Sequence, residues 1–305
     1  MNELAAIPRT RTLGKSGIVV SSMAWGMWRF AGRTVVEARA LVNAALESGI
    51  TLFDTADIYG ADTSGGFGSA EALLGQVFTE DGSARDRMVL ATKGGIVPGV
   101  PYDQSPAHLE AAIDASLRRL NTQHIDLYQI HRPDILAHPH ETARTMEKAR
   151  ALGKIGAFGV SNFTPAQTAA MEAAMPAHGL PLSTTQPEFS PLALGPIEDG
   201  TLDLAMTHDH AVLAWSPLGG GRISNPANPR EAAVAGALDE VAEAHGVSRT
   251  AAAYSWVMAH PAHPIPIIGS QHAARIREAA DAYKVGWTRA AWYKILVASR
   301  EEPLP

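Results

Sequence analysis

The stretch AWGMWRF, from Ala24 to Phe30, decides between the two folds open to this chain. A doubly wound dinucleotide-binding sheet has a G-x-G-x-x-G turn after its first strand. Here the first predicted strand runs into a stretch with one glycine, Gly26, and no such turn. Outward from this stretch, short apolar runs alternate with longer alanine-rich runs typical of helices. The alternation without the glycine turn favours an α/β fold of the (β/α)8 TIM barrel type.

Eight short apolar runs are the predicted barrel strands. They are apolar throughout rather than alternating, which is typical of parallel strands buried on both faces. The predicted strands span residues 23–26, 51–54, 88–92, 125–130, 155–160, 183–186, 212–215 and 265–268. The predicted helices span 34–47, 69–78, 106–120, 139–152, 165–175 and 199–209, with two more in 230–260 and one at 273–282. An N-terminal β-hairpin turning at Gly14 to Gly17 and extra C-terminal helices complete one predicted barrel domain, residues 1–305.

The composition narrows the range of functions. The chain has 305 residues, of which 46% are hydrophobic and 18% charged, enough apolar residues for a large core. Its net charge of −6, without a basic block, argues against nucleic acid as a partner. The absence of cysteine excludes disulfides, thiolate nucleophiles and cysteine-bound metals. With neither a signal peptide nor an apolar run of membrane-spanning length, we expect a cytoplasmic protein without membrane contact. The oligomeric state is not readable.

Four polar residues are predicted to meet at one end of the barrel. Asp54 ends the second predicted strand in LFDTADIYG, and Tyr59 follows in the same stretch. Lys93 ends the third strand, and His131 ends the fourth. Chemistry in a barrel gathers at the C-terminal strand ends, and neighbouring strands lie about 4.8 Å apart. We therefore expect these side chains to contact one another.

These four residue types suit the protonation of a carbonyl oxygen. A free tyrosine has a pKa of about 10, and a nearby ammonium such as Lys93 favours the phenolate and lowers that value. Asp54 would hold Lys93 in place and keep it charged, and His131 would orient a carbonyl by donating a hydrogen bond. Each residue alone has an ordinary interpretation as a cap or surface group. Their arrival on consecutive strand ends favours an acid catalyst.

The chain resembles the aldo-keto reductases from about residue 10 to about residue 300. The motifs that carry the resemblance occur in the family's order: LFDTADIYG, GSAEALLG, ATKGG, LYQIHRPD, GKIGAFGVSNF, TTQPEFSPL and AWSPLGGGR. The WGMWRF and HRPD variants are most similar to bacterial general oxidoreductases. The resemblance implies that Asp54, Tyr59, Lys93 and His131 form a catalytic tetrad with Tyr59 as the acid. It also implies reduction of an aldehyde or ketone, a small-molecule carbonyl substrate, by NADPH, with NADH possible and no metal.

The resemblance further implies a cofactor site across the top of the barrel. Ser161, Asn162 and Gln186 would hydrogen-bond the nicotinamide amide, and Trp215 would stack on its ring. Glycine-rich backbone beside Trp215 suits phosphate oxygens. The full predicted set is Gly26, Met27, Asp54, Ser161, Asn162, Gln186, Trp215, Ser216, Pro217, Leu218, Gly221, Arg222, Ile268, Gly269, Ser270 and Arg275. Ser270 and Arg275 fall where the family contacts the 2′-phosphate of NADPH. Gly269 and Ala279 depart from the lysine and asparagine of many members, which puts the strength of the NADPH preference in question.

Aromatic and apolar residues near the first strand suggest a pocket wall for aromatic or medium aliphatic aldehydes. The predicted wall consists of Trp25, Met27, Trp28, Phe30 and Phe67. Two other functions stay open on the sequence alone. One is a nucleotide-binding subunit of the same fold with little turnover. The other is a Schiff-base lyase with Lys93 as the amine, although a lysine beside Asp54 should stay charged.

Overall fold

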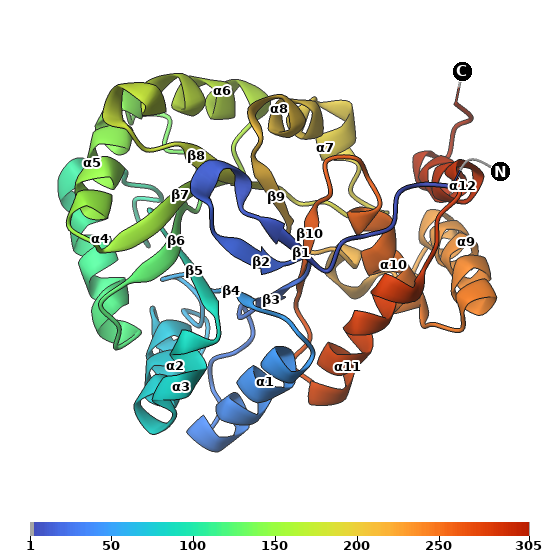
Figure 1. The fold of residues 1–305 in the computed structure, drawn as a ribbon, viewed down its shortest axis with the longest axis horizontal. Coiled ribbons are helices and arrows are strands. Elements are labelled where there is room, and N and C mark those ends of the chain that lie inside the picture. Colours follow the sequence, from blue (N-terminus) through green and yellow to red (C-terminus); the bar gives the residue numbers. More distant parts are fainter. Residues whose placement is uncertain (1–2, 305) are drawn as a thin grey trace.

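The structure, a computed structural model, describes residues 3–304 and contains the predicted eight-stranded parallel barrel. Neighbouring strands follow the order β10-β3-β4-β5-β6-β7-β8-β9, and the first and last of these also pair, which closes the ring. Figure 1 shows the helices arranged around this ring. The (β/α)8 prediction is therefore confirmed. The predicted domain range includes residues 1, 2 and 305, which lie outside the described residues.

The predicted strands and helices are present with small shifts of their ends. The barrel strands are β3 (Ala24–Gly26), β4 (Leu52–Asp54), β5 (Val89–Gly94), β6 (Ile125–Ile130), β7 (Ile155–Ser161), β8 (Leu182–Gln186), β9 (Ala211–Ala214) and β10 (Ile265–Ile268). The predicted helices appear as α1 (Val35–Glu47), α2 (Ser69–Glu80), α4 (Pro106–Arg119), α5 (Pro139–Ala151), α6 (Pro165–Ala174), α8 (Thr201–His208), α9 (Pro229–His245), α10 (Arg249–Met258) and α11 (Ala273–Glu278).

Local signals in the sequence explain several helix ends. The side chains of Ser105 and Thr164 accept hydrogen bonds from backbone N–H groups in the first turns of α4 and α6, each before a proline. Gly49 and Gly153 follow the ends of α1 and α5 with φ of 78° and 72°, the left-handed conformation that glycine tolerates. The chain therefore turns directly from each helix into the next strand.

Some helices were not predicted or differ from the prediction. The short helices α3 (Gly82–Asp86) and α7 (Gly195–Glu198) are unpredicted, and the predicted helix 199–209 begins at Thr201 instead. Extra C-terminal helices were expected, and among the described residues one α-helix, α12 (Arg289–Arg300), follows the last barrel helix. Helix α11 itself continues as a 3-10 turn over Ala279–Lys284. Helices of one turn carry too few periodic positions to give a sequence signal.

The N-terminal hairpin covers one end of the barrel, which leaves the other end for a site. Strands β1 (Thr10–Thr12) and β2 (Val19–Ser21) are joined through a 3-10 turn, and the hairpin lies across the face turned to the viewer in Figure 1. Gly14 lies so close to the starts of β8 and β9 that a Cβ would be 2.4 Å from the carbonyl oxygen of Ser183. Only glycine therefore fits at this contact.

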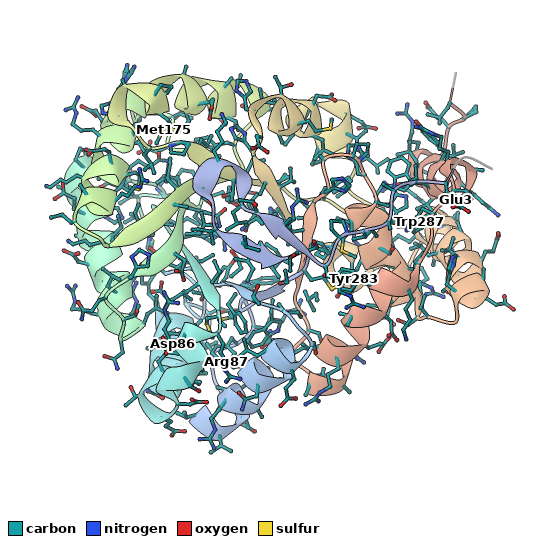
Figure 2. The ribbon with its side chains drawn as sticks, in the orientation of Figure 1. Glu3, Asp86, Arg87, Met175, Tyr283 and Trp287 are labelled. Carbon is teal, nitrogen blue, oxygen red and sulfur yellow. The ribbon has the colours of Figure 1, made fainter. Side chains whose placement is uncertain are left out.

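The two terminal segments lie side by side. Leu4 N donates to Trp287 O at 2.8 Å, and Glu3 forms a β-bridge with Thr288. Figure 2 shows Glu3 and Trp287 together on the side where α9 and α12 pack. This arrangement anchors the chain start outside the helix ring.

Side chains of the barrel strands alternate between two cores. Ala24, Leu52 and Leu127 belong to a small cluster with Leu13 of the hairpin segment. Trp25 and its neighbours in the ring belong to the larger cluster with the helices. This alternation assigns each strand residue to the bore or to the helix layer. None of the helices within residues 3–304 has the length and apolar character needed to cross a membrane.

Candidate active site

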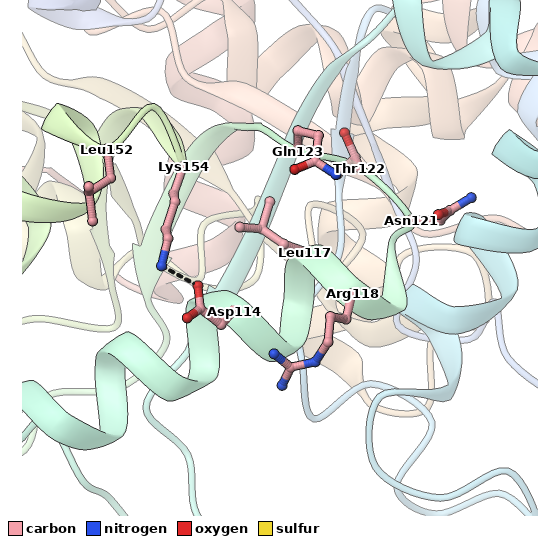
Figure 3. Close-up of a pocket in the computed structure, with 8 residues that line it drawn as sticks. All are labelled: Asp114, Leu117, Arg118, Asn121, Thr122, Gln123, Leu152 and Lys154. Atoms are coloured by element: carbon pink, nitrogen blue, oxygen red, sulfur yellow. Dashed lines mark hydrogen bonds and ion pairs between the residues drawn. The ribbon is translucent and has the colours of Figure 1, made fainter.

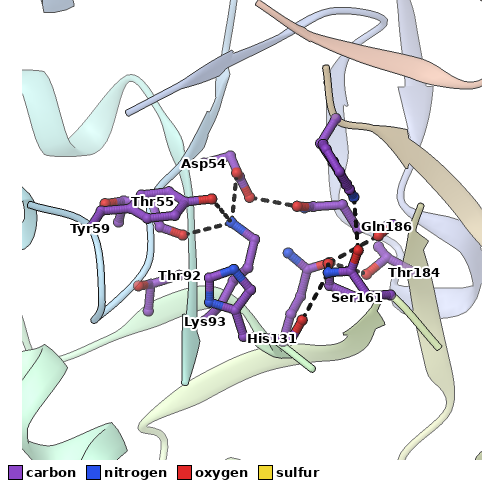
Figure 4. Close-up of polar contacts among 12 residues, drawn as sticks. Asp54, Thr55, Tyr59, Thr92, Lys93, His131, Ser161, Thr184 and Gln186 are labelled. Carbon is purple, nitrogen blue, oxygen red and sulfur yellow. Dashed lines mark hydrogen bonds and ion pairs between the residues drawn. The ribbon is translucent and has the colours of Figure 1, made fainter. Parts of the chain in front are cut away.

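The four predicted catalytic side chains meet at the C-terminal ends of β4, β5 and β6 (Figure 4). Lys93 Nζ lies 2.7 Å from Asp54 Oδ2 and 3.2 Å from Tyr59 Oη. The rings of Tyr59 and His131 are 5.7 Å apart in an edge-to-face arrangement. The structure thus brings the residues into the contact that their strand positions predicted, while their catalytic roles stay predictions.

The ammonium of Lys93 uses all three of its hydrogens. Besides Asp54 and Tyr59, it donates to the backbone carbonyl of Thr55 at 2.9 Å, and the side chain is completely buried. Burial lowers the pKa of Lys93, but the charge of Asp54 and the contacts with Tyr59 outweigh it, so the pKa is raised. A lysine held charged in this way is a poor nucleophile, which disfavours the Schiff-base alternative.

The environment of Tyr59 differs from the expectation in one respect. Burial raises the pKa of the Tyr59 phenol more than the ammonium of Lys93 lowers it, so the pKa is raised overall. The expected lowering by Lys93 is present, but it does not dominate because the site is desolvated. The phenol therefore stays protonated at neutral pH, and the ammonium contacts the oxygen that would carry the charge after proton loss.

His131 is held in its neutral form. Burial, with the nearby charges of Lys93 and Arg132, lowers the pKa of His131 well below its ordinary value. Its Nδ1 atom is buried without a hydrogen-bond partner among residues 3–304. A neutral imidazole has one N–H to donate, which suits the orientation of a carbonyl oxygen.

The predicted nicotinamide contacts form one connected network beside the tetrad. Ser161 Oγ and Asn162 N both donate to the backbone carbonyl of Gln186, at 2.9 and 3.1 Å. Asn162 has a φ of 61°, and its side chain accepts from Trp215 Nε1 at 3.1 Å and donates to His131 O at 3.0 Å. These residues are therefore held in place by one another, whether or not they contact a cofactor.

The surface around the predicted cofactor site fits an extended phosphate-bearing molecule. Gly220 and Gly221 have φ of 68° and 97°, and no heavy atom lies within 4 Å of the place of a Cβ at either. Ser216 also has a positive φ, and Pro217 is buried. Leu218 packs against the two clusters of buried apolar residues that lie between the barrel and its helices. At the end of the neighbouring strand β10, Ile268 is buried and the following Gly269 is exposed. The glycine-rich turn thus offers open backbone, as the sequence predicted.

The predicted pocket wall needs correction. Trp25, Met27 and Phe30 are completely buried in the core cluster between barrel and helices, so their side chains do not line an open pocket. The reason is the alternation of β3, which turns Ala24 and Gly26 toward the bore and Trp25 outward. Trp28 and Phe67 are 61% and 41% exposed and stay candidates for substrate contact.

A buried polar cluster behind the tetrad was missed by the sequence analysis. Glu71 of α2 is completely buried, and it accepts hydrogen bonds from Thr92 Oγ1 at 2.6 Å and from Arg119 Nε at 2.7 Å. Burial, together with the charge of Glu71, raises the pKa of Asp57 to about 8. Asp57 Oδ1 and Tyr128 Oη are buried there without partners among the described residues. The signal available was the acid inside GSAEALLG, an apolar helix sequence.

A surface pocket elsewhere contains none of these residues. Its walls come from the C-terminal part of α4, the following loop, and residues 152 and 154, with an ion pair between Lys154 and Asp114 (Figure 3). It lies where α4 ends and β6 begins, at the opposite end of the strands from Lys93. We assign it no part in the chemistry.

Comparisons with known proteins agree with this geometry. Residues 22–295 match the model of the aldo/keto reductase family. A 6-dehydroglucose reductase of Novosphingobium aromaticivorans is 58% identical over 307 residues, covering 100% of both chains. A 6-dehydroglucose reductase of Agrobacterium fabrum is 36% identical and covers 90% of this chain and 93% of its own. The crystal structure of the thermostable aldo-keto reductase Tm1743 with the inhibitor epalrestat has the same fold, with a TM-score of 0.80, 22% identity and coverage of 95% and 99%.

Proposed function

This chain belongs to the aldo/keto reductase family, and on that premise we propose that it reduces the aldehyde of 6-dehydroglucose to an alcohol with NADPH. Family membership supports an oxidoreductase that acts on carbonyl groups. The substrate is inferred from two relatives of that name, one of them 58% identical along the whole chain. 6-Dehydroglucose carries an aldehyde at C6, so its reduction gives glucose.

One observation carries the proposed reaction: the ammonium of Lys93 is hydrogen-bonded to the phenol of Tyr59 and to a buried carboxylate at the barrel mouth. All three donors of Lys93 have acceptors, so the Tyr59 oxygen accepts from it and keeps its own hydrogen for a substrate. The complete tetrad favours turnover over the alternative of a nucleotide-binding subunit with little turnover.

Each residue of the tetrad has a separate role in the proposed reaction. Bound NADPH supplies a hydride to the C6 carbonyl carbon. The neutral imidazole of His131 donates a hydrogen bond to the carbonyl oxygen, and Tyr59 delivers its proton to that oxygen. The phenolate left on Tyr59 is stabilised by Lys93, whose charge Asp54 maintains, and it is reprotonated from solvent. General acid catalysis of this kind contributes about 10²–10⁴-fold to the rate.

The preference for NADPH rests on Arg275. This side chain is exposed on α11 and makes no hydrogen bond or ion pair with residues 3–304, whereas Arg277 nearby is paired with Glu47 at 2.9 Å. A guanidinium can hold a phosphate through two parallel hydrogen bonds, and Ser270 adds a hydroxyl. Gly269 contributes no second cation, so the preference over NADH should be moderate, at least about tenfold, which is near 1.4 kcal/mol, but below that of a site with two cations.

The test is turnover of defined carbonyls by the purified protein. NADPH oxidation is followed at 340 nm with 6-dehydroglucose, 4-nitrobenzaldehyde and methylglyoxal, and glucose is identified as the product of the first. We expect the highest kcat/KM for 6-dehydroglucose. Turnover of the other aldehydes alone would refute the substrate, and tight NADPH binding with no turnover of any carbonyl would favour the binding-subunit function.

A further inference from the structure

The side chain of Gln186 crosses the bore of the barrel to reach the tetrad. Gln186 ends β8 and Asp54 ends β4, and these strands are four places apart in the ring of eight, on opposite sides of the bore. Gln186 Nε2 nevertheless lies 3.0 Å from Asp54 Oδ1, and both side chains are buried. Figure 4 shows this contact on the side of Asp54 away from Lys93.

The contact fixes which way the amide of Gln186 is turned. Asp54 is ionised in its contact with Lys93, so its carboxylate can only accept, and the amide nitrogen must face it. The carbonyl oxygen of the same amide is then directed elsewhere. No residue among 3–304 donates a hydrogen bond to Gln186 Oε1, although the backbone of Gln186 holds both Ser161 and Asn162.

The two carboxylate oxygens of Asp54 therefore contact different groups, one on each side of the bore. Oδ2 accepts from Lys93 and Oδ1 accepts from Gln186. Lys93 has no free donor left for further adjustment. A group that donates to Oδ1 can therefore change how strongly Asp54 binds Lys93.

We propose that Gln186 is a positioning residue that connects cofactor binding to the proton donor. Its N–H holds Asp54, and its Oε1 accepts a hydrogen bond from the carboxamide of the bound nicotinamide. Hydrogen bonds in a chain polarise one another, so the second bond strengthens the first. The inference rests on the proposed carbonyl reduction for its effect on rate, but its effect on cofactor binding is independent of turnover.

Two substitutions separate this role from simple packing. Gln186→Met keeps the length of the side chain but removes both the donor and the acceptor. Gln186→Glu keeps the shape, and its introduced carboxyl can imitate the amide only while it is protonated. Because two facing carboxyl groups cannot both ionise readily, the pKa of the introduced carboxyl should be strongly raised. Below that pKa it donates to Asp54 and offers a carbonyl oxygen. Above that pKa the donor is lost, and repulsion between the two carboxylates moves the side chain out of its position between Asp54 and the carboxamide.

The main readout is the Kd of NADPH from quenching of tryptophan fluorescence between pH 5 and 9, in the absence of substrate. For Gln186→Glu we expect a Kd near that of wild type at low pH and roughly 10-fold or more weaker binding at high pH, with kcat for 6-dehydroglucose falling over the same range. For Gln186→Met we expect losses of similar size, about 10- to 100-fold in kcat, at every pH.

The control is Thr184→Val, two residues earlier on the same strand. Thr184 is also completely buried, and its hydroxyl donates to Gln129 at 3.0 Å. The Thr184→Val variant should have lower thermal stability, without added pH dependence of the Kd.

If the Kd of Gln186→Glu equals that of wild type at every pH, the inference is wrong. If Gln186→Glu does not fold, Gln186→Met is the deciding variant. A lower kcat with unchanged NADPH affinity, or a weaker NADPH affinity with unchanged kcat, would also overturn the inference. Absence of turnover in wild type would instead refute the proposed function and leave the Kd result standing.

Discussion

Replacement of Asp57 by asparagine should remove a pH dependence from the stability of the protein. Asp57 lies between Asp54 and Tyr59, and it is 2% exposed. Its backbone N–H donates to Lys93 O at 3.0 Å, so it belongs to the turn that positions the tetrad. Burial, followed by the charge of Glu71, raises the pKa of Asp57 to about 8.

The sign follows from proton binding. An unfolded aspartate has a pKa of about 3.9, so between pH ~4 and ~8 the folded state binds a proton that the unfolded state has lost. The stability contributed by protonated Asp57 is therefore complete below pH ~4 and is lost as the pH rises toward about 8. The difference of about four pH units, at about 1.4 kcal/mol each, gives a loss of about 6 kcal/mol.

The Asp57→Asn variant has no such proton to lose, so its advantage over wild type should grow by about 1.4 kcal/mol per pH unit between pH ~5 and ~7. The measurement is urea unfolding of both proteins at several pH values, with Asp62→Asn, an exposed aspartate of the same loop, as the control for a lost surface charge. Parallel stability curves for wild type and Asp57→Asn would refute the reasoning, because they would mean that Asp57 ionises normally in the folded protein.

Two further predictions concern the proposed chemistry and the cofactor preference. Tyr59→Phe removes one hydroxyl, so it should lower kcat by about 10²–10⁴-fold, or roughly 3–5 kcal/mol, with unchanged NADPH affinity in a fluorescence titration. Near wild-type kcat, with chemistry shown to be rate-limiting, would remove Tyr59 from the role of acid. Arg275→Met should weaken NADPH by at least about tenfold and leave NADH nearly unchanged. Equal weakening of both cofactors would show that Arg275 does not meet the 2′-phosphate.

The barrel and the meeting of the tetrad side chains could be predicted because both depend on short-range patterns. Apolar runs of strand length, capped helices and glycine-ended helices set the order of elements along the chain. Because the strands are parallel and these residues lie at their C-terminal ends, Asp54, Lys93 and His131 lie at the same end of the barrel. The register bears this out, since Asp54 pairs with Ala91 and Lys93 pairs with Gln129 on neighbouring strands.

The residues that sequence reasoning misplaced are those whose environment depends on which side of a strand they occupy. Trp25 looked like a pocket residue because it is aromatic and near the site, but a shift of one position decides between bore and helix layer. In β3 that alternation sends Trp25 to the helix layer, where its indole N–H donates to Ser270 O at 2.9 Å. The contact of Gln186 with Asp54 was equally hidden, because the two residues are 132 positions apart and on opposite strands.

The distribution of donors and acceptors explains why the barrel bore matters to this site. Lys93 is saturated by acceptors from its own side of the barrel, namely Asp54, the Thr55 carbonyl and Tyr59. The carboxylate of Asp54 is buried, and one of its oxygens would lack a partner if the neighbouring strands alone supplied the site. Leaving a buried charged oxygen unsatisfied is costly, so a donor must come from across the bore. Gln186 is the side chain that supplies it, and the same residue holds Ser161 and Asn162 through its backbone. The closed ring therefore positions more than the four tetrad residues. Its width sets the distance between β8 and β4, and the amide of Gln186 spans this distance to connect the tetrad with the predicted cofactor site.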